Sequence, residues 1–230
     1  MLFSRLESNP IFINHPQPDL QYDYTLLLNT PGIINIINKQ EFKYSSDLLS
    51  YFKAHIILLP DNHIGKLEPL YPIIKVGNFL PNRKYNTEKY LSEGYLFRYD
   101  SMRHPHYRYG VYKNNKWHLI KNINDAKLIF APINNELEAF SYAILLSGHY
   151  PYFGLKHNKS YRYFVNNIED SYSMKTRNKF IVLLYGNDNK YGCGSFPEYS
   201  IKLEITQNGD ISEIEKIKVF EDLRNVDCWD

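Results

Sequence analysis

The chain has 230 residues, of which 43% are hydrophobic, 16% are aromatic and 23% are charged, and its formal net charge is +2. A chain of this length can bury one large core or two small ones. The composition excludes an intrinsically disordered protein, because disordered chains are poor in apolar residues and carry a high net charge.

The amino-terminal residues, 1–8, lack the apolar run of a secretory signal peptide, and no later apolar run is long enough to span a bilayer. We therefore expect a soluble, cytoplasmic protein with no membrane partner. Two cysteines, Cys193 and Cys228, fit that compartment as free thiols. A disulfide between them is the alternative in an exported protein, and the sequence does not decide whether they pair.

The sequence of residues 1–94 predicts an amino-terminal α/β portion, smaller than the portion formed by residues 95–230. Two apolar runs, 22–28 and 32–37, are rich in strand-forming residues and end at Asn, Pro or Lys, which is typical of strands. We expect these two segments to be strands. The portion could fold alone or continue into the rest of the chain as one domain.

A helix and further strands are predicted in the second half of this portion. Ser46 is a suitable cap for a helix over 47–53, and the apolar run 55–59 predicts a buried strand after it. Two more elements are predicted, a strand at 71–76 and a short helix at 87–93.

Residues 95–230 predict a mainly antiparallel sheet packed against one principal helix, which makes the fold class of the whole chain α+β. Apolar and polar residues alternate over 107–112 and again over 117–119. Between them, Asn114 and Asn115 tolerate the positive φ that a tight hairpin turn requires. We therefore predict a β-hairpin here.

The principal helix has the strongest local signal. Asn135 with Glu138 three residues later forms a capping box, and Gly148 suits the left-handed residue that ends a helix. The apolar stripe of this helix is expected to consist of Leu137, Phe140 and Ile144. A shorter helical turn over 125–130 is expected before it, capped by Asn124.

Three strands are expected after the principal helix. The run 180–185 is apolar on both faces and suits a central strand, and 201–205 alternates as a strand with one buried face does. Asn208 and Gly209 then predict a turn into a last strand over 211–220. The apolar phase of that strand slips between Ile214 and Ile217, which predicts a β-bulge.

Two segments could carry chemistry. An extended His104-Pro105-His106 segment would point both imidazoles to one side, where they could bind a metal together with Asp100. Cys193 lies between two glycines and could be a nucleophile, with His149 or His157 as its base. The plainer interpretation of the histidine segment is an exposed loop, and that of the Cys193 segment is a turn between strands. We expect no cofactor.

Charge is unevenly distributed along the chain. Residues 98–121 contain six lysines or arginines and one acid, residues 156–179 contain six and two acids, and residues 198–230 contain nine acids and four bases. Basic residues interleaved with aromatic ones are typical of single-stranded nucleic-acid binding, and a surface rich in tyrosine and arginine is equally typical of protein-binding hot spots. The residues expected to form such a Tyr/Arg-rich binding surface are Arg103, His104, His106, Tyr107, Arg108, Tyr109, Tyr150 and Tyr152.

Three classes of function could use this pattern. The preferred prediction is a non-enzymatic protein that binds another protein, in the manner of a bacterial immunity or inhibitor protein, because charge suited to steering is present and no reaction centre is evident. The enzymatic alternative is a metal- or cysteine-dependent hydrolase. The further alternative is single-stranded nucleic-acid binding through segments such as 161–163, although nucleic-acid domains are usually more basic than this chain.

Overall fold

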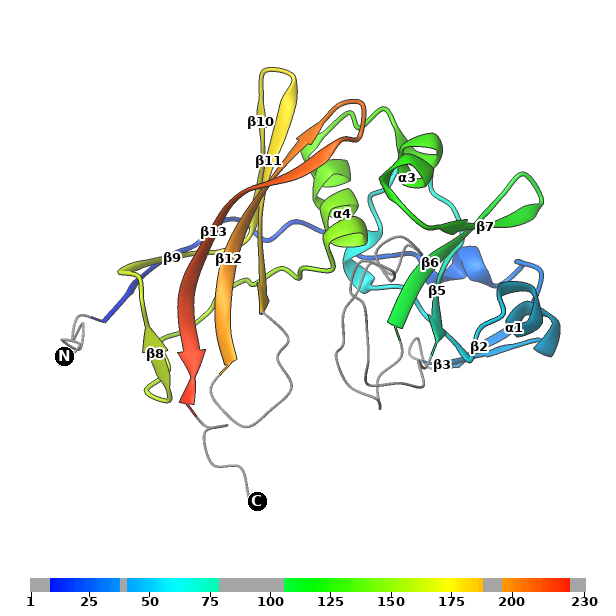
Figure 1. Ribbon diagram of the computed structural model, residues 1–230, viewed down its shortest axis with the longest axis horizontal. Helices are drawn as coiled ribbons and strands as arrows, with labels where there is room; N and C mark the ends of the chain where they lie inside the picture. Colours follow the sequence, from blue (N-terminus) through cyan, green and yellow to red (C-terminus); the bar gives the residue numbers. More distant parts are fainter. Residues whose placement is uncertain (1–8, 38–40, 79–105, 188–195, 224–230) are drawn as a thin grey trace, which may run out of the picture.

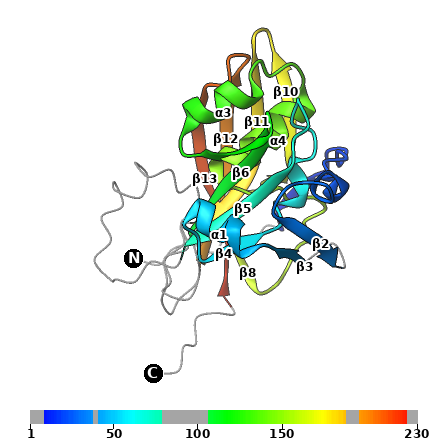
Figure 2. The same ribbon diagram turned by 90° about the vertical axis from the view of Figure 1, so that its right-hand side faces the viewer.

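Two antiparallel sheets lie side by side with a helix between them (Figure 1). Seen from the side, the smaller sheet stands in front of the larger one (Figure 2). One cluster of buried apolar side chains includes residues of both sheets and of the helix between them. The predicted α+β class with mainly antiparallel sheet is therefore confirmed. The computed structural model describes residues 9–37, 41–78, 106–187 and 196–223.

The larger sheet has five strands in the order β10-β11-β12-β13-β8, and all neighbours are antiparallel. β11 is an interior strand, paired on both sides, which agrees with its apolar sequence, and Phe180, Val182 and Leu184 are buried in the main core. The strands are β8 (Tyr161–Tyr163), β10 (Tyr172–Thr176), β11 (Lys179–Asn187), β12 (Phe196–Thr206) and β13 (Ile211–Asp222).

The β12-β13 hairpin contains the predicted turn and the predicted bulge. Gly209 has a φ of 79°, a left-handed conformation that glycine adopts without strain. Lys202 pairs with Glu215 and Leu203 pairs with Glu213, so Ile214 is the extra residue of a bulge.

The smaller sheet has the order β4-β5-β6-β7 and is also antiparallel. Its strands are β4 (Ile56–Leu58), β5 (Ile73–Asn78), β6 (His106–Lys113) and β7 (Lys116–Ile120). The predicted β6-β7 hairpin is confirmed, with φ of 53° at Asn114 and 60° at Asn115. This sheet joins the two predicted portions, because β4 and β5 precede residue 94 and β6 and β7 follow it. The division into 1–94 and 95–230 stays a prediction.

Two short ribbons and several short helical segments complete the described fold. β1 (Ile11–Ile13) runs parallel to β9 (Asn167–Glu169), and β2 (Ile33–Ile37) pairs antiparallel with β3 (Glu41–Tyr44). The helices are α1 (Ser46–Phe52), α3 (Ile123–Phe130) and α4 (Glu136–Ser147), with 3-10 turns η1 (Tyr24–Leu27) and η2 (Asn62–Ile64). Among the described residues, no helix is long and apolar enough to cross a bilayer.

Helix α4 lies between the two sheets. The Asn135 side chain accepts a hydrogen bond from the Glu138 N–H at 3.0 Å, and Gly148 ends the helix with a φ of 71°, as predicted. Phe140 and Ile144 are buried, but Leu137 is 40% exposed, so its place in the predicted apolar stripe was wrong.

Three local predictions were wrong. In each case a side chain that was not considered accepts a hydrogen bond from a nearby backbone N–H and so sets where a helical turn begins. The segment predicted as a strand at 22–28 contains η1, because the Asp23 carboxylate accepts from the Thr25 N–H at 2.9 Å and its hydroxyl at 2.6 Å. The cap of α1 is Ser45 rather than Ser46, and the cap of α3 is Asn122 rather than Asn124.

Two positions of α4 provide a matched test of this packing. We expect Phe140→Ala to lower the free energy of unfolding by about 3 to 5 kcal/mol, because it leaves a cavity in the main core where the Phe140 ring packs against Phe153. Leu137→Ala on the same helix should cost less than about 1 kcal/mol, because that side chain is partly in solvent. Denaturant melts measure both values, and equal losses would contradict the described position of α4.

Candidate functional site

Half of the residues predicted for a metal or cysteine site, and two other residues singled out from the sequence, lie outside the described part of the chain. Asp100, Arg103, His104, Cys193 and Cys228 lie outside the described residues. His106 begins β6, where the structure describes its backbone. In the described ranges, no group of three or more His, Cys, Asp and Glu side chains could hold a metal ion.

The two histidines proposed as bases lie on different elements. His149 follows α4 and packs closely against β11, since a Cβ on Gly186 would lie 2.5 Å from its Nδ1 atom. Burial lowers the pKa of His149 to about 4, and the nearby Lys216 charge adds to the effect, so the imidazole is neutral at pH 7. His157 is exposed and stacks on the Tyr163 ring at 5.3 Å. The role of His149 or His157 as a base for Cys193 stays a prediction.

The predicted Tyr/Arg surface is partly core. Tyr109 is completely buried and donates its hydroxyl to Asp61, so its ring is not available to a partner. Tyr107 and Arg108 are half-buried, and the Lys75 Nζ atom lies 5.7 Å from the Tyr107 ring centroid. Tyr109 therefore has to be removed from the predicted binding surface.

Tyr150 and Tyr152 belong to a second, aromatic core cluster at the β8 end of the larger sheet. Tyr150 exchanges two backbone hydrogen bonds of 2.9 Å with Tyr185 and donates its hydroxyl to Glu198. The Tyr152 ring lies 5.1 Å from the Tyr185 ring and 6.3 Å from the Phe220 ring. Both side chains are half-buried and pack mainly within the fold.

Glu198 is a buried carboxyl within this cluster. It is 6% exposed, and burial raises its pKa to about 7, while the Tyr150 hydroxyl bond opposes the shift. The group is therefore partly protonated near neutral pH. Its neighbours on β13 include Phe220, which pairs with it in the sheet.

Within the described residues, the charged segments are partly intermixed. The basic residues of 156–179 divide between the β8 region and the β10-β11 turn, at opposite ends of the larger sheet (Figure 1). Acids of β12 and β13 pair with lysines at 2.5 to 2.8 Å, in the pairs Lys179–Glu204, Lys202–Glu215 and Lys218–Glu221.

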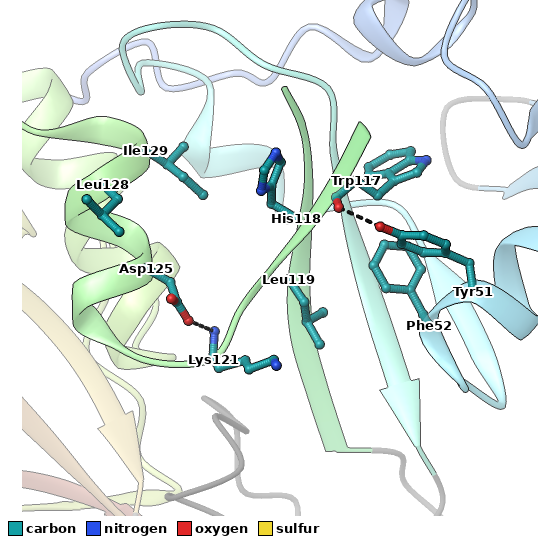
Figure 3. A pocket seen from close by; sticks show the side chains of 9 residues that line it. All are labelled: Tyr51, Phe52, Trp117, His118, Leu119, Lys121, Asp125, Leu128 and Ile129. Carbon is teal, nitrogen blue, oxygen red and sulfur yellow. Dashed lines mark hydrogen bonds between the residues drawn. The ribbon is translucent and has the colours of Figure 1, made fainter. Parts of the chain in front are cut away.

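A concavity of about 480 Å³ lies along β7, between α1 and α3 (Figure 3). We call it the β7 groove. Helix α1 forms one wall and helix α3 the other, while β7 forms the floor between them. The groove is lined by Tyr51, Phe52, Trp117, His118, Leu119, Lys121, Asp125, Leu128 and Ile129.

Two large side chains of the walls are open to solvent. Leu128 is 80% exposed and Tyr51 is 60% exposed. Leu128 points away from the face of α3 that buries Ala126, Ile129 and Phe130. Leu128 is therefore an exposed apolar side chain that does not belong to the buried face of its helix.

The walls and the floor are held by specific contacts. The Tyr51 hydroxyl donates to the Trp117 carbonyl at 2.9 Å, and the Phe52 ring packs edge-on against the Trp117 ring at 5.8 Å. The Trp117 Nε1–H donates to the Pro31 carbonyl at 3.1 Å. At the other wall, the Asp125 carboxylate accepts from the Lys121 N–H at 2.8 Å. The groove is therefore preformed by the fold.

No family model matches this chain, and neither a curated protein nor a solved structure matches it. The geometry of the β7 groove therefore carries the functional conclusion. Sequence reasoning missed the groove because its three elements are far apart in the chain. One signal was available: Leu128 breaks the apolar phase of its helix.

Glu198 gives a pH-dependent prediction. Its pKa in the fold lies above the ordinary value of 4.5, so the fold favours the protonated form, and this contribution to stability is lost as the pH rises toward 7. Glu198→Gln keeps an acceptor for Tyr150 without the charge. We expect the variant to be more stable than wild type by about 2 to 3 kcal/mol at pH 8, with the difference vanishing near pH 4.5.

Denaturant melts of the two proteins across this pH range measure that difference. The control is Glu213→Gln, because Glu213 is an exposed acid on the adjacent strand. Its difference from wild type should stay within about 0.5 kcal/mol at every pH. A pH-independent effect of Glu198→Gln would show that the carboxyl is not buried as described.

Proposed function

We propose that this protein is a non-enzymatic binding protein of the immunity or inhibitor type, which holds a partner protein in the β7 groove. The observation that carries this proposal is the preformed concavity of mixed polar and apolar lining, with exposed Leu128 and Tyr51 at its walls. Concave sites lined by aromatic and aliphatic side chains with a few polar groups are where proteins most often hold a ligand or partner.

The residue types in the groove support a protein partner. Tyrosine, tryptophan and phenylalanine are enriched at the centres of protein interfaces, where a few anchors supply most of the affinity. Covering a side chain such as Leu128 contributes about 1.5 to 3 kcal/mol. Because the Phe52 and Trp117 rings pack against each other and the Trp117 Nε1–H is bonded to the Pro31 carbonyl, these two side chains would lose little freedom on binding.

The charge near the groove indicates what the partner carries. Lys116 and Lys121 are exposed at the two ends of β7, and Lys113 extends over the end of α3, with its Nζ atom 3.4 Å from the Leu128 carbonyl. Asp125 is the one acid among the lining residues, and it already accepts a hydrogen bond from the backbone. The surplus of lysine favours a partner with acidic residues around an apolar anchor.

The alternatives have less support from the described residues. Tyr161 stacks on Phe220 with a ring separation of 4.7 Å, and Tyr163 packs against Phe220 and His157, so these rings are not open platforms for bases. The hydrolase alternative depends on Asp100, His104 and Cys193, which lie outside the described residues, and stays a prediction.

Site-specific photo-crosslinking tests the proposal. The protein is expressed in its source cells with a benzophenone amino acid at position 128 and irradiated there. It should form a covalent adduct with one partner protein at the groove. The same amino acid at position 137 serves as the matched control, because Leu137 is also a partly exposed helix leucine but does not line the groove.

Leu128→Gln should weaken recovery of the same partner at least tenfold, and Leu137→Gln should leave it unchanged. Adducts at 137 but not at 128, or no adduct at all, would contradict the proposed function. Isothermal titration with the identified partner then measures the loss directly.

A further inference from the structure

Strand β7 is an edge strand, and its outer edge forms the floor of the β7 groove. It pairs with β6 on one side only, as the last strand of the order β4-β5-β6-β7. Helices α1 and α3 stand on either side of that edge, and the Tyr51 hydroxyl of α1 bonds to one of its carbonyls, that of Trp117 (Figure 3). An uncovered edge presents backbone N–H and C=O groups that can pair with another strand.

The hairpin geometry determines which backbone groups face the groove. In an antiparallel hairpin with a two-residue turn, the residues flanking the turn form a hydrogen-bonded pair, and bonded and non-bonded pairs then alternate. On β7 the bonded positions are therefore Lys116, His118 and Ile120. The backbone groups of Trp117 and Leu119 must point to the outer edge.

Two hydrogen bonds agree with this assignment. Tyr112, the partner of Trp117 on β6, donates its N–H to the Pro72 carbonyl at 2.9 Å, away from β7. The Trp117 carbonyl accepts the Tyr51 hydroxyl from the groove side. In the part of the chain that the structure describes, the N–H groups of Trp117 and Leu119 and the Leu119 carbonyl have no hydrogen-bond partner.

In the larger sheet the edge strands are β10 and β8, and β13 is open only along the part that does not pair with β8, where charged residues and the bulge at Ile214 discourage pairing with a foreign strand. β7 is regular, since its register with β6 has no bulge, and it is the edge strand that lines the groove. The β7 edge is therefore the one where a single segment can contact both a sheet edge and the groove walls.

We infer that the β7 groove takes an extended segment of the partner protein, which adds as a further strand along β7. This inference rests on the proposed function and names how that partner binds. The backbone of the segment pairs with Trp117 and Leu119, while its alternate side chains contact Phe52 on one wall and Leu128 on the other. Lys116 and Lys121 favour acidic residues at its ends.

A helical segment fits this edge less well. A helix satisfies its own backbone groups, so it would cover the Trp117 and Leu119 N–H groups without bonding to them, and burying an unpaired donor is unfavourable. An extended segment supplies the missing acceptors. It also displaces the Tyr51 hydroxyl from the Trp117 carbonyl, which then accepts a backbone N–H instead.

Selection from a random library of displayed peptides about twelve residues long tests the inference. Selected peptides should compete with one another for binding, and none should bind the Leu128→Gln variant. Methylating single backbone nitrogens of the best peptide should weaken binding at least tenfold at alternate residues and little at those between, because a strand bonds with every second residue. In amide exchange, the Trp117 and Leu119 N–H groups should become protected.

Proline at position 119 provides the matched test on the protein. Leu119→Pro removes an outward N–H, which an edge strand tolerates, whereas Leu119→Ala removes the side chain and keeps the N–H. We expect Leu119→Pro to bind the peptide at least tenfold more weakly than Leu119→Ala, with thermal melts showing that both variants fold. If Leu119→Pro does not fold, the methylated peptides decide the question.

Three results would overturn the inference. The first is a set of peptides whose binding is insensitive to backbone methylation, or depends on anchors three and four residues apart. The second is a library that yields no binder at the groove. The third is a dimer by light scattering that Leu128→Gln dissociates, which would show that a second copy of the chain occupies the groove. The crosslink at position 128 is measured independently. A partner captured there without strand-type binding would overturn the inference and leave the proposed function intact.

Discussion

Helix α4 has almost no face in contact with water, and the placement of both sheets depends on its burial. Two of its polar side chains bind opposite sides of the molecule: Ser141 donates to the His63 carbonyl in η2 at 3.2 Å, and Tyr142 donates to the Gly209 carbonyl in the β12-β13 turn at 2.9 Å. A buried hydroxyl without a partner is unfavourable, so each bond also restricts the position of the segment that supplies its acceptor.

The groove is a consequence of this arrangement. With α4 occupying the space between the sheets, the smaller sheet can present its β7 edge outward, and α3, the helix before α4 in the chain, stands beside that edge. On the other wall, the close approach of Phe52 to the backbone depends on Gly110, where a Cβ would lie 3.0 Å from the Phe52 ring. The walls are thus built from packing that the core already requires.

Predictions from the sequence succeeded where a local signal determines the structure. The caps of α4, the Asn114-Asn115 turn and the Ile214 bulge each follow from a few neighbouring residues, and all are present. The groove could not be predicted in this way, because it combines residues near 51, 118 and 128 that only tertiary packing brings together. Tyr109 was misjudged for the same reason, since its partner Asp61 is distant in the chain.

One consequence of the groove concerns optical spectroscopy. The chain has two tryptophans, and one of them, Trp117, contributes its indole to the groove and its carbonyl to the Tyr51 hydroxyl bond. Indole emission depends on the polarity around the ring and on nearby quenching groups. Replacing Trp229 with phenylalanine would leave Trp117 as the single tryptophan, so the emission of the unlabelled protein would report whether the groove is filled.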